Sequence, residues 1–297
     1  MSLMAVAGDV RDEMMRAGDL VAELATALAS GRVEDPRREA SDIVAAIVDA
    51  PRFWPAQHRD EILAPLVIDR ARAAARRRAE GAPFAYAVGR AAFRHLTLLV
   101  DERVLIPRQE TEVLVEEVLS RVRGGVVVDV GTGSGAIALS LASEGAYERV
   151  IATDVSRAAL AVAAENVRRC ASALRCPVDL VAGSLLSPIL GARVDAVVAN
   201  PPYIAHTEAH ELPDEVRNWE PPTALFSGSE GLRDTARLIR EAPDVLRPGG
   251  LLALEVDARR ASQVVALAKA EARFRDVIIR PDLTGRDRIL LATRVGE

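Results

Sequence analysis

The segment Asn200-Pro201-Pro202-Tyr203 carries the side chains of this chain that are best suited to chemistry. The Asn200 side-chain oxygen and the Pro201 backbone carbonyl are acceptors, and each can take one hydrogen of a planar NH2 group. The prolines stiffen the segment because their rings fix φ at about −65°, and the Tyr203 ring can lie against the plane that carries the nitrogen. Such a segment is typical of a site that alkylates an amide or an exocyclic amine. The alternative is a Pro-rich turn between a strand and a loop.

A glycine-rich turn lies upstream, between the apolar run 126–130 and the apolar segment 136–142, which is typical of the first turns of a helix. The turn consists of Gly131, Thr132, Gly133, Ser134 and Gly135. A strand, a glycine turn and a helix N-terminus let the backbone approach a ligand closely and present free N–H groups to it. The spacing differs from the G-x-G-x-x-G fingerprint of dinucleotide sites.

A second predicted strand, residues 149–153, is followed by Asp154. A carboxylate at the end of such a strand can accept hydrogen bonds from both hydroxyls of a ribose. The alternative is that Asp154 only caps a helix that begins near Ser156. Together with the glycine turn and the amine-holding segment, the acid points to S-adenosylmethionine as the cofactor and not to a nicotinamide.

The elements that must position these residues alternate between strands and helices from about residue 112. Strands are predicted at residues 126–130, 149–153, 178–182, 194–199, 250–256, 274–280 and 288–294. Alternation of this kind implies an α/β fold with a mainly parallel sheet covered on both faces. Ligands of such sheets bind at the carboxyl ends of the strands. Gly131, Asp154 and Asn200 each follow a strand, so we expect them at one rim.

The chain before this pattern is predicted to be helical. Residues 1–80 form a small all-helical domain in this interpretation, because Leu20, Leu24 and Leu28 recur at helical spacing. Its Phe53 and Trp54 are expected in the core. Residues 81–105 are interpreted as a linker or hairpin, and residues 106–297 as the domain that carries the chemistry. The arginines of the helical domain cluster, and the cluster is interpreted as a solvated helix face; it consists of Arg70, Arg72, Arg76, Arg77 and Arg78.

Composition limits the class of protein. A net charge of −5 over 297 residues argues against broad electrostatic binding to nucleic acid. The chain has no run of apolar residues long enough to span a membrane. Residues 1–15 lack the continuous apolar stretch of a signal peptide, so we expect a cytoplasmic protein. The pairs Cys170 and Cys176, and His206 and His210, do not predict a disulfide framework or a metal site.

Several segments, in order, resemble those of one enzyme family over about residues 80–294. The similar segments are 83–89 (PFAYAVG), 104–112 (VLIPRQETE, similar to IPRPETE), 200–204 (NPPYI), 220–225 (EPPTAL) and 282–288 (DLTGRDR, similar to DLxGxxR). The chain thereby resembles the protein-(glutamine-N5) methyltransferases that modify class-I peptide chain release factors, the PrmC/HemK family.

The resemblance implies a fold, a reaction and a set of residues. The fold is a seven-stranded Rossmann-like class I methyltransferase sheet behind a small N-terminal helical domain that docks the substrate. The reaction transfers a methyl group from S-adenosyl-L-methionine to the glutamine N5 of a Gly-Gly-Gln motif in class-I release factors, without a metal. The implied catalytic residues are Asn200, Pro201, Pro202 and Tyr203. The implied cofactor-binding residues are Gly131, Thr132, Gly133, Ser134, Gly135, Asp154, Ser184, Leu185 and Asn200.

The chain also departs from the family pattern. Gln109 stands in place of a second proline, and Ser184 in place of an acid near the adenine. The residues after Glu255 lack the usual glycine and glutamine. These departures leave open a paralogue that methylates another protein or a small-molecule amine. An adenine-N6 or cytosine-N4 methyltransferase of nucleic acids uses a similar loop on a flipped base, but the acidic net charge disfavours it. A non-catalytic binding protein is disfavoured because both loops are intact.

Overall fold

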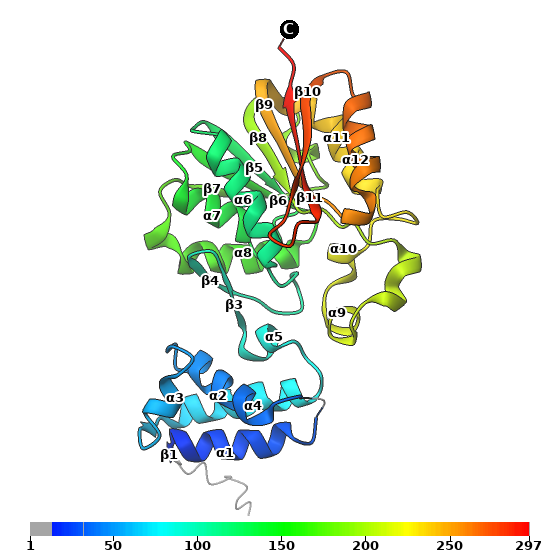
Figure 1. Cartoon of the computed structure of the whole chain (residues 1–297). Helices are drawn as coiled ribbons and strands as arrows, with labels where there is room; N and C mark the ends of the chain where they lie inside the picture. The colour runs from blue at the N-terminus through cyan, green and yellow to red at the C-terminus, as the bar shows by residue number, and fades with distance from the viewer. Residues whose placement is uncertain (1–13, 32, 297) are drawn as a thin grey trace, which may run out of the picture. The chain divides into compact units, whose positions relative to one another are not determined.

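The computed structural model of the chain describes residues 14–31 and 33–296 and has two compact units, Met1–Val88 and Gly89–Glu297 (Figure 1). Most of the segment that was considered as a signal peptide, residues 1–13, lies outside the described residues. Within the described part of the chain, no helix is long and apolar enough to cross a membrane.

The N-terminal unit is built from helices. They are α1 (Ala17–Leu28), α2 (Pro36–Ile47), α3 (Trp54–Gln57), α4 (Pro65–Ala79) and α5 (Phe84–Val88). The leucines that predicted α1 are buried in one core with Ile43 of α2 and Ile68 of α4. Strand β1 (Met15–Arg16) precedes α1, strand β2 (Ile62–Leu63) precedes α4, and the two strands form a short antiparallel pair. Strands of this length carry no periodicity, so the sequence could not predict them.

Two predictions for this unit meet different outcomes. Trp54 packs against the core and stacks on His58, with ring centroids 4.6 Å apart. The prediction of a buried Phe53 is wrong, because its side chain is 72% exposed. Phe53 lies in the turn before the short helix α3, where no periodicity indicates which of two neighbouring aromatic rings faces the core.

The arginine cluster of α4 is partly structural. Arg72 donates to both carboxylate oxygens of Glu23 on α1, at 2.7 and 2.8 Å. Arg78 donates to Glu39 on α2 and to the Ala82 carbonyl. The cluster therefore ties α4 to its two neighbouring helices.

The C-terminal unit begins with a hairpin and continues into a 7-stranded sheet. The hairpin consists of β3 (Arg90–Phe93) and β4 (Leu96–Leu99). The sheet has the order β10-β11-β9-β8-β5-β6-β7. Its strands are β5 (Val126–Val130), β6 (Arg149–Asp154), β7 (Val178–Ala182), β8 (Val194–Ala199), β9 (Leu246–Glu255), β10 (Phe274–Pro281) and β11 (Asp287–Arg294). The predicted α/β class and all the predicted strands of the sheet are confirmed.

Helices cover both faces of this sheet (Figure 1). One face packs against α6 (Gln109–Arg121) and α7 (Ala136–Glu144), and the other packs against α11 (Arg233–Val245) and α12 (Ala261–Ala270). Helix α8 (Arg157–Arg169) connects β6 to β7, and the short helices α9 (Asp214–Trp219) and α10 (Pro222–Leu225) follow β8. The central strands β5 and β8 are apolar except for one aspartate each, as burial on both faces of a sheet requires.

The strand order reverses at β5. Parallel strands β6 and β7 lie on one side of it, and parallel β8 and β9 lie on the other. The antiparallel pair β10 and β11 closes the sheet beside β9. Doubly wound sheets bind ligands in the crevice at such a reversal, outside the carboxyl ends of the strands.

Candidate functional site

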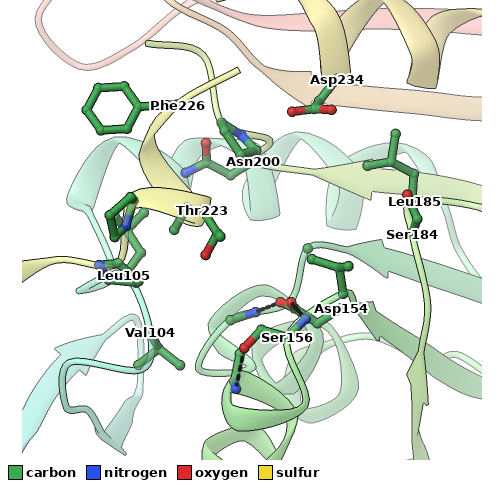
Figure 2. A pocket seen from close by; sticks show the side chains of 18 of the residues that line it. Val104, Leu105, Asp154, Ser156, Ser184, Leu185, Asn200, Thr223, Phe226 and Asp234 are labelled. Atoms are coloured by element: carbon green, nitrogen blue, oxygen red, sulfur yellow. Dashed lines mark hydrogen bonds between the residues drawn. The ribbon is translucent and has the colours of Figure 1, made fainter. Parts of the chain in front are cut away.

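The carboxyl ends of β5, β6 and β8 bring Gly131, Asp154 and Asn200 to the wall of one cavity of about 460 Å³. Figure 2 shows Asp154 and Asn200 at this wall. Of the other predicted site residues, Gly133, Ser184, Leu185 and Pro202 also line it. Sequence reasoning missed many of the remaining wall residues, which include Val104, Leu105, Val155, Ser156, Pro222, Thr223, Phe226 and Asp234. Val155 and Ser156 directly follow the strand-end acid and could have been found from that position. The others come from segments whose facing direction no local pattern reveals.

The glycine turn adopts backbone conformations that favour glycine. Gly131, Gly133 and Gly135 have φ of +75°, +55° and +86°, a region that costs other residues energy. The N–H groups of Gly131 and Thr132 both donate to the Thr153 carbonyl, at 2.8 and 2.9 Å, and bind the turn to the end of β6. A Cβ on Gly131 or Gly133 would meet no atom within 4 Å. The backbone at these positions is therefore open to close approach by a ligand.

The two polar residues of the turn face the interior. The Thr132 hydroxyl donates to Asp129 at 2.6 Å, and the Ser134 carbonyl accepts from the buried Asn166 amide at 2.9 Å. Burial raises the pKa of Asp129 to about 7, although the hydrogen bond from Thr132 and that from the Ala138 N–H lower it. In this structure Thr132 and Ser134 support the turn from behind.

Asp154 joins the glycine turn to the start of α8. Its Oδ2 accepts from the Gly133 N–H at 2.9 Å, and its Oδ1 accepts from the Ser156 N–H at 2.8 Å. Ser156, not Asp154, is the N-cap of α8, because its hydroxyl accepts from the Ala159 N–H. A carboxylate has about four lone-pair sites, so acceptor capacity remains on the side of Asp154 that faces the cavity.

Ser184 and Leu185 follow β7 at the cavity wall. The Ser184 hydroxyl accepts from Arg237 of α11 at 2.9 Å. Leu185 has a φ of +49°, in the left-handed region that residues with a Cβ rarely adopt. Its carbonyl accepts from the Thr153 hydroxyl at 3.1 Å, and its side chain is drawn at the cavity in Figure 2. Backbone strain of this kind is concentrated at ligand sites.

A second, smaller cavity of about 170 Å³ adjoins the first at Asn200. Its walls are Leu105, Arg108, Asn200, Tyr203, Ile204, Leu212, Val216, Ala224 and Leu225. Asn200 lines both cavities, with Leu105 and Ala224, so the first residue of the Asn-Pro-Pro-Tyr segment stands between a large and a small space. Pro202 faces the large cavity and Tyr203 the small one, whereas Pro201 is buried.

The walls of the smaller cavity are tied together. The Ile204 N–H donates to the Leu225 carbonyl at 3.0 Å, and the Ser227 N–H donates to the Ile204 carbonyl at 3.0 Å. Arg108 also donates to Glu220, which is 3% exposed. Burial raises the pKa of Glu220, and the charge of Arg108 opposes that rise. These contacts hold three of the segments picked out in the sequence, 104–112, 200–204 and 220–225, around one space.

The larger cavity fits a nucleoside-containing cofactor. Its volume lies within the range of about 300–1,000 Å³ that is common for small-molecule sites. Apolar walls such as Val155, Leu185 and Phe226 face a single strand-end carboxylate and an open glycine backbone. The Phe226 ring stacks on His206, with centroids 5.1 Å apart. The cavity therefore offers apolar walls for a flat heterocycle and a carboxylate for ribose hydroxyls.

Comparison with known proteins agrees with this geometry. A model of the family described as "Methyltransferase small domain" matches residues 109–215, and one described as "PrmC N-terminal domain" matches residues 19–89. A release factor glutamine methyltransferase from Moorella thermoacetica is 45% identical over 275 residues, which are 91% of this chain and 95% of that protein. One from Xylella fastidiosa strain Temecula1 is 41% identical over 273 residues, covering 91% and 97%.

A solved structure confirms the fold. The methyltransferase from Pyrococcus furiosus superposes with a TM-score of 0.50 at 19% identity and covers 67% of this chain and 89% of its own. The predicted class I methyltransferase sheet is thereby confirmed, and the methyl donor of this chain is S-adenosyl-L-methionine. Because these two relatives are 45% and 41% identical to it over nine-tenths of its length, this chain belongs to the release factor glutamine methyltransferase family.

Proposed function

We propose that this protein methylates the side-chain amide nitrogen, N5, of the glutamine in the Gly-Gly-Gln motif of class-I peptide chain release factors. The observation that carries the proposal is the place of Asn200 between two cavities. One has room for a nucleoside cofactor and the other has the size of a side chain. The relatives are named for a release factor glutamine as substrate, and a glutamine side chain suits the smaller space.

The larger cavity is proposed to hold S-adenosyl-L-methionine. Asp154 would accept hydrogen bonds from the ribose hydroxyls, Gly131 and Gly133 would lie against the ligand, and Ser184 and Leu185 would form the wall beyond β7. Thr132, Ser134 and Gly135 would act indirectly, by holding the turn. When bound, the cofactor supplies a methyl group on a positively charged sulfur.

The protein residues are proposed to work by positioning. An amide nitrogen is a weak nucleophile because its lone pair is delocalised into the carbonyl. The Asn200 side-chain oxygen and the Pro201 carbonyl would each accept one N–H of the substrate amide and aim the nitrogen at the methyl group. A carbon–nitrogen bond forms, the carbon–sulfur bond breaks, and one amide proton leaves to water. Alignment can lower a barrier by several kcal/mol, and acceptors stabilise the positive charge that develops on nitrogen.

Tyr203 and its neighbours would hold the rest of the glutamine. The Tyr203 ring lines the smaller cavity with Leu212, Val216 and Leu225. An aromatic face and aliphatic walls suit a planar amide on a short methylene stem. Burial raises the pKa of Tyr203 well above its ordinary value, and the charge of Glu255 adds to the rise. Tyr203 therefore stays neutral and does not serve as a base at physiological pH.

The helical unit is proposed to dock the substrate. A protein substrate presents a surface far larger than one glutamine, and the N-terminal unit matches a family domain of its own.

The lining of the smaller cavity does not favour a nucleic acid as substrate. Its one basic residue is Arg108, which is paired with Glu220. A release factor as substrate would place the enzyme in the cytoplasm, where ribosomes work.

Mass spectrometry of a purified class-I release factor incubated with this protein and S-adenosylmethionine tests the proposal. The expected product carries one added methyl group on the Gly-Gly-Gln glutamine. A release factor in which that glutamine is replaced is the matched substrate control and should gain none. An unmodified release factor, together with cofactor binding seen by calorimetry, would show that the substrate is another amine.

A further inference from the structure

A chain of hydrogen bonds runs from Asn200 into the protein. The Asn200 Nδ2 donates to the Thr111 hydroxyl oxygen at 3.1 Å. The Thr111 hydroxyl donates in turn to Oε2 of Glu255 at 2.6 Å. Thr111 belongs to α6 and is 4% exposed, and Glu255 ends β9 and is 1% exposed. Neither residue lines the two cavities.

The chemistry of these groups fixes the direction of each hydrogen bond. Ionised Glu255 can only accept, so above its pKa of about 7 the single hydroxyl hydrogen of Thr111 is committed to it. The Thr111 oxygen can then only accept, and its neighbour must be a donor. The amide of Asn200 is nearly symmetric in shape, and its oxygen and nitrogen could otherwise exchange places. The chain therefore holds Nδ2 toward the protein and leaves Oδ1 as the atom available elsewhere.

Glu255 also reaches the other end of the same segment. Its pKa is raised to about 7 by burial, and it is lowered by the hydrogen bond from Thr111, by the charge of Arg288 and by a hydrogen bond from Tyr203. One buried carboxylate is thus hydrogen-bonded through Thr111 to Asn200, and its charge raises the pKa of Tyr203 at the other end of the segment.

We propose that Thr111 and Glu255 are positioning residues that turn the Asn200 amide so that its oxygen accepts from the NH2 group of the substrate. The inference rests on the proposed function of Asn200. With the amide reversed, its NH2 would face the NH2 of the substrate, and two donors would meet. A hydrogen bond that strengthens as the amide nitrogen becomes positive would be lost.

Three variants separate this role from a purely structural one. Thr111→Val removes the hydroxyl at nearly constant shape, and Thr111→Ser keeps it. Glu255→Gln keeps the shape but places an NH2 donor within reach of Thr111. The Thr111 hydrogen can then turn to Asn200 and favour the reversed amide. At pH 8, where Glu255 is ionised, we expect kcat to fall by about 100-fold in Thr111→Val and Glu255→Gln, the order of losing one transition-state hydrogen bond. Thr111→Ser should keep wild-type kcat.

Two further readouts accompany kcat. The Kd for S-adenosylmethionine, measured by calorimetry, should stay within about 2-fold of wild type in all three variants, since none of the changed atoms lines the larger cavity. The hydrogen exchange of the Asn200 side-chain NH2, followed by NMR, should be slow in wild type and in Thr111→Ser but fast in Thr111→Val. This last measurement needs no substrate and reads the orientation directly.

The outcomes distinguish the two proposals. Wild-type kcat in Glu255→Gln would overturn the positioning role, and so would equally fast exchange of the Asn200 NH2 in wild type and Thr111→Val. A loss of kcat that follows the melting temperature and is not rescued by Thr111→Ser would mean that the chain of bonds only stabilises the fold. A wild-type protein that methylates no release factor, with slow exchange at Asn200, would refute the proposed substrate and leave the amide orientation standing.

Discussion

The N–H of Gly133 donates to Oδ2 of Asp154 at 2.9 Å, so the centre of the glycine turn is bonded to the acid at the end of the neighbouring strand. The turn and the acid are separated by a whole helix in the sequence, yet they form one rigid wall of the larger cavity. A substitution at Gly133 or at Asp154 should therefore alter the conformation of the other residue.

Asp154→Ala is expected to weaken cofactor binding. The substitution removes the proposed acceptor for the ribose hydroxyls and also frees the Gly133 and Ser156 N–H groups. Loss of hydrogen bonds to a charged group, at about 1.5–3 kcal/mol, corresponds to a rise in Kd of roughly 10- to 100-fold. Calorimetry with S-adenosylmethionine measures it. Asp179→Ala, on exposed β7 outside the cavity, is the matched control and should keep the wild-type Kd. Equal affinity in both variants would refute the ribose assignment.

Asn200→Ala is expected to abolish most turnover. Removing one acceptor that strengthens in the transition state lowers kcat by about 100- to 1,000-fold. The larger cavity keeps its other walls, so cofactor affinity should change little. Methyl transfer to a release factor under single-turnover conditions, beside calorimetry, separates these two quantities. If cofactor affinity collapses instead, Asn200 serves mainly as a cofactor ligand.

Gly133→Ala is expected to impair binding more than stability. Gly133 has a φ of +55°, and an alanine there costs about 1–2 kcal/mol of backbone strain. Its Cβ would meet no protein atom within 4 Å, so the added methyl group lies in the space where the ligand is proposed to approach. Gly124→Ala is the control, because the Cβ there makes only an ordinary contact of 3.6 Å with the Ala146 carbonyl. A Gly133→Ala protein that binds the cofactor normally would place the ligand elsewhere.

Glu255 is expected to make stability depend on pH. Burial raises its pKa from 4.5 to about 7. Between these values the folded protein keeps a proton that the unfolded chain has lost, so the free energy of unfolding falls as pH rises from about 4.5 to 7 and stays lower above that. The loss is on the order of 3 kcal/mol.

Comparison of the wild type with Glu255→Gln isolates this effect, because buried Asp129 has a pKa raised to about 7 as well and contributes a parallel fall in both proteins. Urea unfolding at pH 5 and pH 8 is the measurement. The variant should gain stability relative to wild type at the higher pH. If the free energies of unfolding of the variant and the wild type differ by the same amount at both pH values, the pKa of Glu255 is not raised by burial.

Much of the fold followed from local patterns. Apolar runs such as 126–130 and 194–199 predicted buried strands, and the glycines at 131, 133 and 135 predicted a turn between a strand and a helix. Because parallel strands end at one edge of a sheet, the sequence alone placed Gly131, Asp154 and Asn200 at one rim. The roles of these residues toward cofactor and substrate stay predictions.

Other features depended on which side chains meet across the fold. Thr132 and Ser134 belong to the glycine turn but face the interior, and Phe53 is exposed beside a packed Trp54. Turns have no repeating period, so the sequence cannot say which of two neighbours faces inward.

Short stretches of sequence were enough to indicate the class of fold, the family and the segment that is proposed to hold an amide, because strand periodicity, glycine conformation and acceptor chemistry are properties of short stretches. The hydrogen bonds from Asn200 to Thr111 and from Thr111 to Glu255 are visible only in the folded protein. Asn200 follows β8, Thr111 belongs to α6 and Glu255 ends β9, so the three residues are far apart along the chain. Their meeting depends on the strand order and on how α6 packs on the sheet, and both are set by burial of the whole core.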